Sequence, residues 1–452
     1  MFRKMADIYN CQVGAWQRCF LRELFKVVLS LRGRVNFTNL ARFSQLHEQT
    51  FRRHFEKAFQ WVWFNLIAFR LRHHPEEPVI GVFDCSFLPK SGTETWGLDR
   101  FFSSLAGKSK KGLEVSVLGL VATESRRAFG VDATQTPPNL STDQTGGYSR
   151  VDFYLEQIID LYDRFADLGV SYWVGDGFYA KQKVFDTVTG LGGHLITRLR
   201  SDANLRYLYT GPKKEGPGAP KQYDGKIDWE DQGELAKQFD ETSRLPDQPG
   251  VRVLTTVANS PHFGRDLRVV LLVGPSGEEQ AMLASTDTNQ RAEEIVRYYR
   301  LRYQIELVIR DAKQHTGLPH CQARSQEKLD FHLNMSIAAV NLLRLLARKA
   351  GCSPRTYRRE APRSETTLVF FGNVSCVEST RQRKYGEPAV QGAARSARAR
   401  GKQRLRPSKA SSRIAPYCSQ PPPPLKKPLK KGVPRVDPFQ SPERARGFLR
   451  CG

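Results

Sequence analysis

The sequence predicts an α/β fold, with a helical segment before the sheet, a β-rich insertion inside it and a basic tail after it. Two predicted strands at 78–88 and 170–180 are rich in apolar, β-branched residues, and in each of them the apolar stretch leads to an aspartate, Asp84 or Asp176. Residues 150–168 between them have helical periodicity. The chain has 452 residues, of which 40% are hydrophobic, so it is long enough for two or three domains with a large core.

Basic residues are concentrated at the C-terminal end. The formal net charge is +24, which indicates an anionic partner. From residue 351 onward there are 23 Lys and Arg against 6 Asp and Glu, so this segment alone contributes +17. It also holds half of the 26 prolines. Such a composition cannot bury a core, so we predict a disordered Pro/Arg/Lys-rich tail over residues 351–452.

The N-terminal residues 1–75 are predicted to form a helical DNA-binding domain. Residues 36–59 predict two short helices around a turn at 44–47, as in a helix-turn-helix. The second of these helices would direct Arg52 and Arg53 outward, toward DNA. A small helical bundle with a basic surface is the alternative that the same residues allow.

The elements that follow have the order of a ribonuclease-H-like sheet. Three strands come first, and then helix, strand, helix and strand. They are predicted at 78–88, 113–123, 126–136, about 150–168, 170–180 and, after a further helix, 193–200. Residues 76–200 therefore form the first part of the predicted catalytic domain.

The character of the sequence changes between residues 201 and 289. A loop rich in Gly, Pro and Lys is followed by short strands, so we predict a β-rich insertion; these strands are expected at 251–258, 266–274 and 279–286. Helical periodicity resumes at about residue 291 and continues to residue 350. Residues 290–350 are therefore the helical last part of the predicted catalytic domain.

One stretch of this helical part, "YYRLRYQIELVIRDAK" at 298–313, carries polar residues that simple core packing does not need. Four of them are spaced by three, four and seven residues, which places them within roughly 60° of one another on a helix. They are Tyr299, Arg302, Glu306 and Lys313. A neighbouring apolar stripe would face the core. A solvated face with ordinary intrahelical ion pairs is the simpler alternative.

Asp84 and Asp176 are each predicted to end an apolar strand. In the predicted topology these strands are parallel neighbours about 4.8 Å apart, so two carboxylates meet at one end of the sheet. Glu306 lies on a helix that would pack across this sheet. Three converging carboxylates suit Mg²⁺, with Mn²⁺ as a substitute. Two such ions can activate a water or a 3′-hydroxyl and stabilise the leaving oxygen of a phosphodiester.

The other polar residues of the helix would hold the substrate strand. Arg302 and Lys313 would neutralise phosphates, and Tyr299 would hydrogen-bond a phosphate or stack on a base. The predicted catalytic and metal-binding residues are Asp84, Asp176 and Glu306, and the predicted DNA-binding residues are Tyr299, Arg302, Lys313, Arg52 and Arg53.

These motifs resemble a known family. The pattern Y-x2-R-x3-E-x6-K at 299–313 is similar to the signature of DDE transposases of bacterial insertion sequences, the Y-R-E-K group. Asp84 and the "GDGFYA" at 175–180 match that family's first and second catalytic aspartates, and "HLITRLRSDANL" at 194–205 resembles the stretch after the second. The resemblance covers roughly residues 35–350.

The resemblance implies a transposase that binds the inverted repeats at element ends as a homodimer on double-stranded DNA. It further implies metal-dependent strand cleavage and strand transfer, as in cut-and-paste transposition. After residue 350 the sequence departs from the family, whose members usually continue in folded, helical sequence, and a frameshifted C-terminus would leave the enzyme inactive. A non-catalytic transposon-derived DNA-binding protein or repressor and a nuclease that never rejoins strands are the alternatives. The three acidic residues favour an enzyme.

Two further observations concern the compartment. Eight cysteines show no C-x-x-C pair, which is typical of reduced thiols. No apolar run approaches about 18 residues, and Lys26 interrupts the apolar stretch near the N-terminus, so neither a transmembrane helix nor a signal peptide is expected. We therefore expect a cytoplasmic, nucleoid-associated bacterial protein with no membrane partner.

Overall fold

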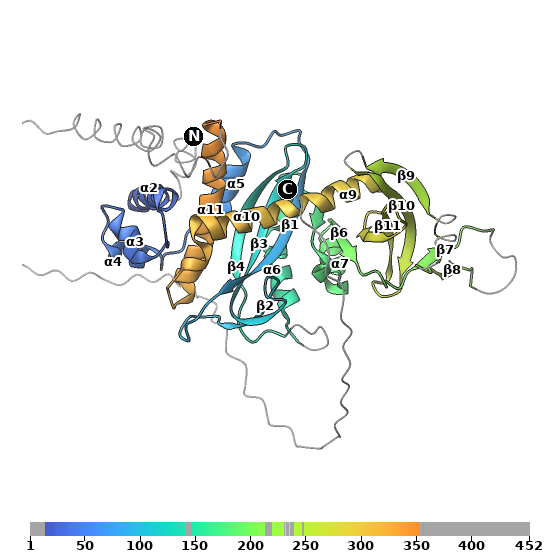
Figure 1. Ribbon diagram of the computed structural model, residues 1–452, viewed down its shortest axis with the longest axis horizontal. Coiled ribbons are helices and arrows are strands. Elements are labelled where there is room, and N and C mark those ends of the chain that lie inside the picture. The colour runs from blue at the N-terminus through green and yellow to red at the C-terminus, as the bar shows by residue number, and fades with distance from the viewer. Residues whose placement is uncertain are drawn as a thin grey trace, which may run out of the picture. The chain divides into compact units, whose positions relative to one another are not determined.

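The computed structural model describes residues 14–141, 147–212, 219–229, 231, 235, 239–245, 248–351 and 356 (Figure 1). The tail predicted at 351–452 therefore lies outside the described residues, apart from Gly351 and Thr356. None of the helices in the described ranges combines the length and the apolar character that crossing a membrane requires.

The first described elements are helices: α2 (Ala15–Ser30), α3 (Phe37–Arg42), α4 (Glu48–His54) and α5 (Trp61–Arg70). The next group alternates strands and helices: β1 (Val79–Pro89), β2 (Asp99–Ser103), β3 (Lys108–Ala122), β4 (Arg127–Gln135), α6 (Arg150–Ala166), β5 (Tyr172–Val174), η1 (Gly177–Tyr179), α7 (Gln182–Gly190) and β6 (His194–Leu199). This order confirms the predicted α/β fold class, and it adds β2, which the sequence did not predict.

The insertion is rich in strands, as predicted: β7 (Arg206–Leu208), β8 (Tyr223–Lys226), β9 (Asp240–Leu245), β10 (Gln248–Ser260), β11 (Arg265–Val273) and β12 (Glu279–Ser285). All the described strands belong to one sheet with the order β2-β3-β1-β5-β6-β12-β11-β10-β7-β8, in which β4 also pairs with β3 and β9 with β10. Because β12 pairs antiparallel with β6, the insertion continues the sheet rather than forming a separate one.

From Gly112 to Ala122 both faces of β3 are buried, because helices cover both faces of the sheet there. Successive residues of a strand point to opposite faces. On one face, Ser116 donates a hydrogen bond of 2.7 Å to Gln157 of α6. On the other face, a Cβ atom at Gly119 would lie 2.6 Å from the side chain of Ile305, which belongs to the helix that crosses β1, β3 and β4. Odd-numbered residues of β3 near this point therefore face that helix.

The helical last part is broken several times, so the helical periodicity predicted from residue 291 to residue 350 does not correspond to continuous helix. It consists of α9 (Ala292–Leu301), α10 (Tyr303–Asp311), the π-helical η2 (Ala312–Thr316), the 3₁₀ turn η3 (Leu318–His320) and α11 (Gln326–Lys349). Gly317 ends η2 with a φ of +78°, a left-handed conformation that favours glycine, and Pro319 follows it.

α11 covers the free edge of β4 with side-chain amides. The carboxamide of Asn334 accepts from the backbone N–H of Ala133 and donates to its carbonyl, at 3.1 and 2.8 Å. Asn341 does the same for Gly130, at 3.2 and 2.7 Å. An edge strand would otherwise leave these groups unpaired, and buried backbone groups without partners cost free energy.

The N-terminal helices pack on α11 through aromatic rings. The ring of Phe331 lies 4.4 Å from that of Phe55 and 4.9 Å from that of Trp61, centroid to centroid. Phe20 of α2 lies 5.6 Å from Phe51 of α4 in the same way. These helices therefore share a hydrophobic core with the end of the described chain, and the division into domains at residue 75 stays a prediction.

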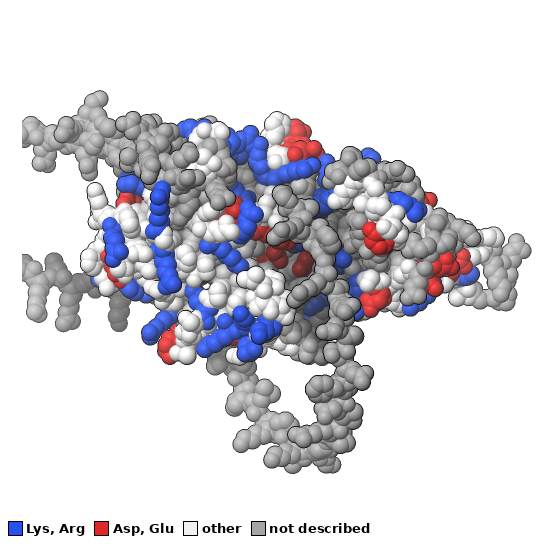
Figure 2. Space-filling model, in the orientation of Figure 1, with Lys and Arg blue, Asp and Glu red and all other residues white. Residues whose placement is uncertain are grey.

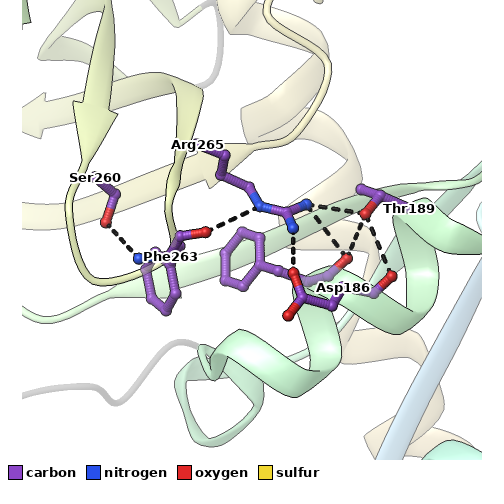
Figure 3. A network of polar contacts seen from close by, with 6 residues as sticks. Asp186, Thr189, Ser260, Phe263 and Arg265 are labelled. Carbon is purple, nitrogen blue, oxygen red and sulfur yellow. Dashed lines mark hydrogen bonds and ion pairs between the residues drawn. The ribbon is translucent and has the colours of Figure 1, made fainter.

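One polar network fastens the insertion to α7 (Figure 3). Arg265, at the start of β11, donates to Oγ1 of Thr189 at 2.9 Å, to the carbonyl oxygen of Phe185 at 3.4 Å and to the carboxylate of Asp186. The ring of Phe263 stacks on that of Phe185 with 4.3 Å between centroids. The turn between β10 and β11 is thus held against α7, the helix that connects β5 to β6 in the chain.

We expect Arg265→Ala to lower the free energy of unfolding by about 1–3 kcal/mol, because charge-assisted hydrogen bonds to α7 are lost. Urea unfolding followed by circular dichroism measures this change. Arg200→Ala is the matched control, since Arg200 forms an ion pair with Asp202 in which the side chains are 86% and 67% exposed. That control should change the free energy by less than about 0.5 kcal/mol. Equal effects of the two substitutions would contradict the fastening role.

Candidate active site

Asp84 lies where β1 and β5 separate. The two strands pair in parallel only at Gly81 with Trp173 and at Val82 with Val174. The prediction that Asp84 ends its strand is wrong: β1 runs on to Pro89 because β3 continues to pair with it. Asp84 is nevertheless the second residue beyond the last pair with β5. It is paired with Val117 on β3, an odd-numbered position, so its side chain is on the face that α10 covers.

Asp176 lies two residues beyond β5, in the turn that begins η1. The predicted strand at 170–180 is much shorter in the structure because Asp176 accepts a hydrogen bond of 3.0 Å from the backbone N–H of Phe178, which starts the 3₁₀ turn. Thr197 of β6 donates to the Asp176 carbonyl oxygen at 2.8 Å. Asp84 and Asp176 therefore follow the same parallel pair, as the sequence predicted.

The glycine before Asp176 is required by crowding. A Cβ atom at Gly175 would lie 2.6 Å from the ring of Phe83 and 3.1 Å from Cβ of Tyr179. Phe83 and Tyr179 pack edge to face with 4.6 Å between centroids, so neither ring can move freely. The backbone next to Asp176 therefore packs tightly against Phe83, the neighbour of Asp84 in β1.

Gly175→Ala should therefore destabilise the protein by about 1–3 kcal/mol, the usual cost of overpacking. Gly190→Ala is the matched control, because a Cβ atom at Gly190 meets nothing within 4 Å and this glycine is the last residue of α7. The control should be neutral or slightly stabilising. Thermal unfolding of the two variants checks the comparison, and a Gly175→Ala protein as stable as its control would show that the turn tolerates a side chain.

Glu306 lies on α10 and forms an ion pair with Arg302. The Nη2 atom of Arg302 is 2.7 Å from Oε1 of Glu306, and the side chains are 15% and 37% exposed. The helix predicted at 298–313 breaks at Arg302, whose backbone N–H is shared between the carbonyl oxygens of Tyr298 and Tyr299 at 3.3 and 3.2 Å. The predicted apolar stripe beside the polar residues is buried.

Arg302 lies among the acidic groups of the site. Burial lowers the pKa of its guanidinium, but the carboxylates of Glu306, Asp84 and Asp176 act against burial and raise it above the ordinary value. Its Nε is a buried donor that finds no acceptor among the described residues. Its guanidinium also lies 5.7 Å from the ring centroid of Tyr299. Arg302 therefore offsets the charge of three carboxylates and keeps one donor unused.

Tyr299 is partly buried near the same groups. Burial raises the pKa of its hydroxyl, which interacts electrostatically with Arg302, Arg198 and Asp176. Tyr299 therefore lies near Asp176 and Arg302, as its predicted place on the same side of the helix as Arg302 and Glu306 implied. Figure 2 shows acidic side chains set back between basic ones beside the position of β1 in Figure 1.

Lys313 is bound to β1. Its ammonium group donates to Oγ of Ser86 at 2.8 Å and to the carbonyl oxygen of Phe87 at 2.9 Å. Burial lowers its pKa, while the nearby Asp84 raises it. An ammonium group has three donors, and these contacts with β1 use two of them. The π-helical η2, which begins at Ala312, carries Lys313 at this point.

The sequence prediction missed Lys181 and Phe178, which lie just after Asp176. The Lys181 ammonium nitrogen is 4.0 Å from the ring centroid of Phe178, and that ring is 41% exposed. Burial lowers the pKa of Lys181, and the charge of Asp176 acts in the opposite direction. Their closeness to Asp176 in the sequence, as "GDGFYAK", is the signal that could have identified them.

Arg52 and Arg53 differ in their surroundings. The two predicted short helices form as α3 and α4. Arg52 donates from Nε to Glu48 at 2.8 Å and lies 4.8 Å from the ring centroid of Phe37, so it is tied to its own helices. Arg53 is exposed. The structure thus leaves Arg53 more open to a ligand than Arg52, and a DNA-binding role for either stays a prediction.

The carboxylates have the chemistry of a divalent-metal site. Burial, followed by the nearby charge of Asp176, raises the pKa of Asp84 to about 7. A carboxylate that is this costly to ionise is stabilised by a cation, and oxygen ligands suit Mg²⁺ or Mn²⁺. In the described part of the chain, however, no three acidic, imidazole or thiol groups form a group that could hold a metal ion. Glu306 is directed to Arg302 instead.

The raised pKa of Asp84 predicts how the stability of the fold depends on pH. The folded protein keeps this proton up to about pH 7, whereas the unfolded chain loses it near pH 4. Above about pH 7, Asp84 is ionised in the folded protein, and the full free-energy cost of burying its charge destabilises the fold. This cost disappears as the pH falls from 7 to 4. Asp84→Asn should raise the Tm at pH 8 by several degrees and leave it nearly unchanged at pH 4.

Thermal unfolding in chelator-treated buffer at both pH values measures this difference. Asp202→Asn serves as the control, because Asp202 is exposed and forms its ion pair with the exposed Arg200. Equal gains from Asp84→Asn at pH 8 and pH 4 would show that the change acts through packing rather than through ionisation.

A sheet of this order, with acidic residues beyond its short parallel pair and a third on the helix that crosses it, defines a ribonuclease-H-like α/β domain. Residues 150–342 match the family model described as "Transposase DDE domain". The matched range contains Asp176 and Glu306, whereas Asp84 precedes it. The recognition as a DDE transposase is confirmed; membership of the Y-R-E-K group stays a prediction. No curated protein matches the chain.

Proposed function

We propose that the protein is a transposase that cuts and joins double-stranded DNA at the ends of its element, with Asp84, Asp176 and Glu306 as catalytic carboxylates. The observation that supports this most is the pair of aspartates beyond the parallel pairing of β1 with β5, facing the ion pair of Arg302 and Glu306. DDE transposases are enzymes of DNA transposition, and the matched domain includes two of the three acidic residues.

Mg²⁺ or Mn²⁺ bound at the carboxylates would supply Lewis-acid activation of a water or 3′-hydroxyl and of the leaving oxygen. The residues of the chain have separate tasks. Arg302 would donate from its unused Nε to a phosphate of the bound strand, and Lys313 would donate its third N–H in the same way. Tyr299 would hydrogen-bond a phosphate or stack on a base.

The wider assignment follows from the family. We propose that the element ends are inverted repeats, that two copies of the chain act together on DNA by a cut-and-paste route, and that Arg53 and Arg52 of α4 contribute to DNA binding. We also propose that the protein works in the bacterial cytoplasm on chromosomal DNA. The Y-R-E-K spacing from Tyr299 to Lys313 supports the narrower group.

Three substitutions test the catalytic assignment: Asp84→Asn, Asp176→Asn and Glu306→Gln. Each keeps the size of the side chain and removes its charge. The assay is nicking and linearisation of a plasmid that carries the DNA flanking the gene, with Mg²⁺ or Mn²⁺. We expect each variant to lose at least about 100-fold in rate, since charge in the transition state is no longer stabilised. Binding to the same DNA should stay within about twofold.

Asp202→Asn is the matched control and should cleave as the wild type does. Cleavage near the wild-type rate by any of the three variants would remove that residue from the site. If the wild type bound the flanking DNA but never cut it, the non-catalytic binding protein or an enzyme inactivated at its C-terminus would be the better assignment.

A further inference from the structure

β2 and β3 form a hairpin that continues the ladder of β1 and β3 beyond the site. Its paired rows run from Asp99 with Gly112 to Ser103 with Lys108. The tip turns at residues 104–107, where Gly107 has a φ of +62°. We call residues 99–112 the basic hairpin, because its cations are Arg100, Lys108, Lys110 and Lys111 and its single carboxylate is Asp99.

One face of the basic hairpin is fixed to α6. Arg150, at the start of α6, lies 4.4 Å from the ring centroid of the fully buried Phe101. It also pairs with Asp99 at 3.3 Å and donates to the carbonyl oxygen of Arg100 at 3.2 Å. The carboxylate in the hairpin is therefore already neutralised, and the hairpin is held in a defined direction.

The opposite face carries exposed cations and an exposed ring. Arg100 is directly opposite Lys111, and Phe102 is directly opposite Ser109. Arg100 donates a hydrogen bond of 3.0 Å to the carbonyl oxygen of Ser109 across the hairpin. Like charges in directly opposed positions destabilise a pair of strands, and an anionic ligand would relieve this repulsion. Phe102 is 61% exposed, and Leu105 at the tip is 99% exposed. In Figure 2, Lys and Arg side chains gather where Figure 1 shows β2.

This face is the same face of the sheet that carries Asp84. Asp84 is paired with Val117, and Arg100 is paired with Lys111. Both partners are odd-numbered residues of β3, so Asp84 and Arg100 point to the same face of the sheet. The rows are six residues apart along β3, which corresponds to about 20 Å. That distance is the length of about six base pairs of duplex DNA, at 3.4 Å each.

We propose that the basic hairpin binds the DNA duplex about six base pairs or more from the scissile phosphate, with Phe102 and Leu105 as an apolar contact at its tip. Arg100 and Lys111 contact phosphates, and the apolar side chains contact sugars or a base step. This inference rests on the proposed DNA substrate, and it assigns part of that substrate to a segment outside the catalytic carboxylates.

Two variants separate the charged contact from the apolar one. The charge variant combines Arg100→Gln and Lys111→Gln, both at exposed positions on this face. The tip variant combines Phe102→Ser and Leu105→Ser. The control combines Arg164→Gln and Arg200→Gln, which removes the same charge from exposed positions elsewhere. Circular dichroism confirms folding of each variant.

Fluorescence anisotropy with a labelled 30-base-pair duplex from the DNA flanking the gene, between 50 and 300 mM salt, gives the readout. The charge variant should bind at least about tenfold more weakly and should reduce the slope of log K against log salt by about 2, since each phosphate contact contributes about 0.9. The tip variant should bind several-fold more weakly with an unchanged slope. The control should resemble the wild type.

Equal losses by the charge variant and the control would overturn the inference, because net charge alone would then explain binding. It would also be overturned if the tip variant converted a dimer into a monomer, by light scattering, with DNA affinity unchanged, since a second copy of the chain would then cover the tip. Wild-type protein that binds no DNA would refute the proposed function as well. Wild-type binding with both hairpin variants unaffected would refute only the hairpin assignment.

Discussion

β1 and β5 pair at only two positions, and the site depends on where this pairing ends. Beyond Val82 and Val174 the strands separate, because β1 stays with β3 while the chain after β5 turns into η1. Two aspartates are therefore close in space without a backbone ladder between them. The wedge of Gly175 against Phe83 fixes the turn, and α10 covers the same face with Glu306.

Electrostatic balance follows from this arrangement. Three carboxylates near a partly buried point repel one another, and the protein compensates with Arg302 from the helix that crosses the sheet. Lys313 adds a second positive group, bound to the stretch of β1 just beyond Asp84. The break at Arg302 and the π-helical turn at Lys313 both occur where the helix meets these charges. Irregular helix geometry therefore occurs at the charged residues of the candidate site.

The sequence predicted the α/β class, the two aspartates and the polar helix because apolar runs and helical spacing are local signals. It could not predict that β1 continues past Asp84, since that depends on pairing with β3, far along the chain. The hairpin strand β2 was missed because "DRFFS" and "KSKKG" lack an apolar alternation. The contact of Lys313 with Ser86 joins residues 227 positions apart, which no spacing rule reveals.

The amide pairs of Asn334 and Asn341 with β4 also fix the position of α11 along its own axis. The two residues are seven apart, close to two helical turns, so both meet the strand edge from one side of the helix. A slide of one turn, about 5.4 Å, would leave four buried backbone groups of β4 without partners, at about 1–3 kcal/mol each. The N-terminal helices whose aromatic rings pack on Phe331 therefore share one fixed register with the central sheet, and a force applied to these helices is transmitted to the strands.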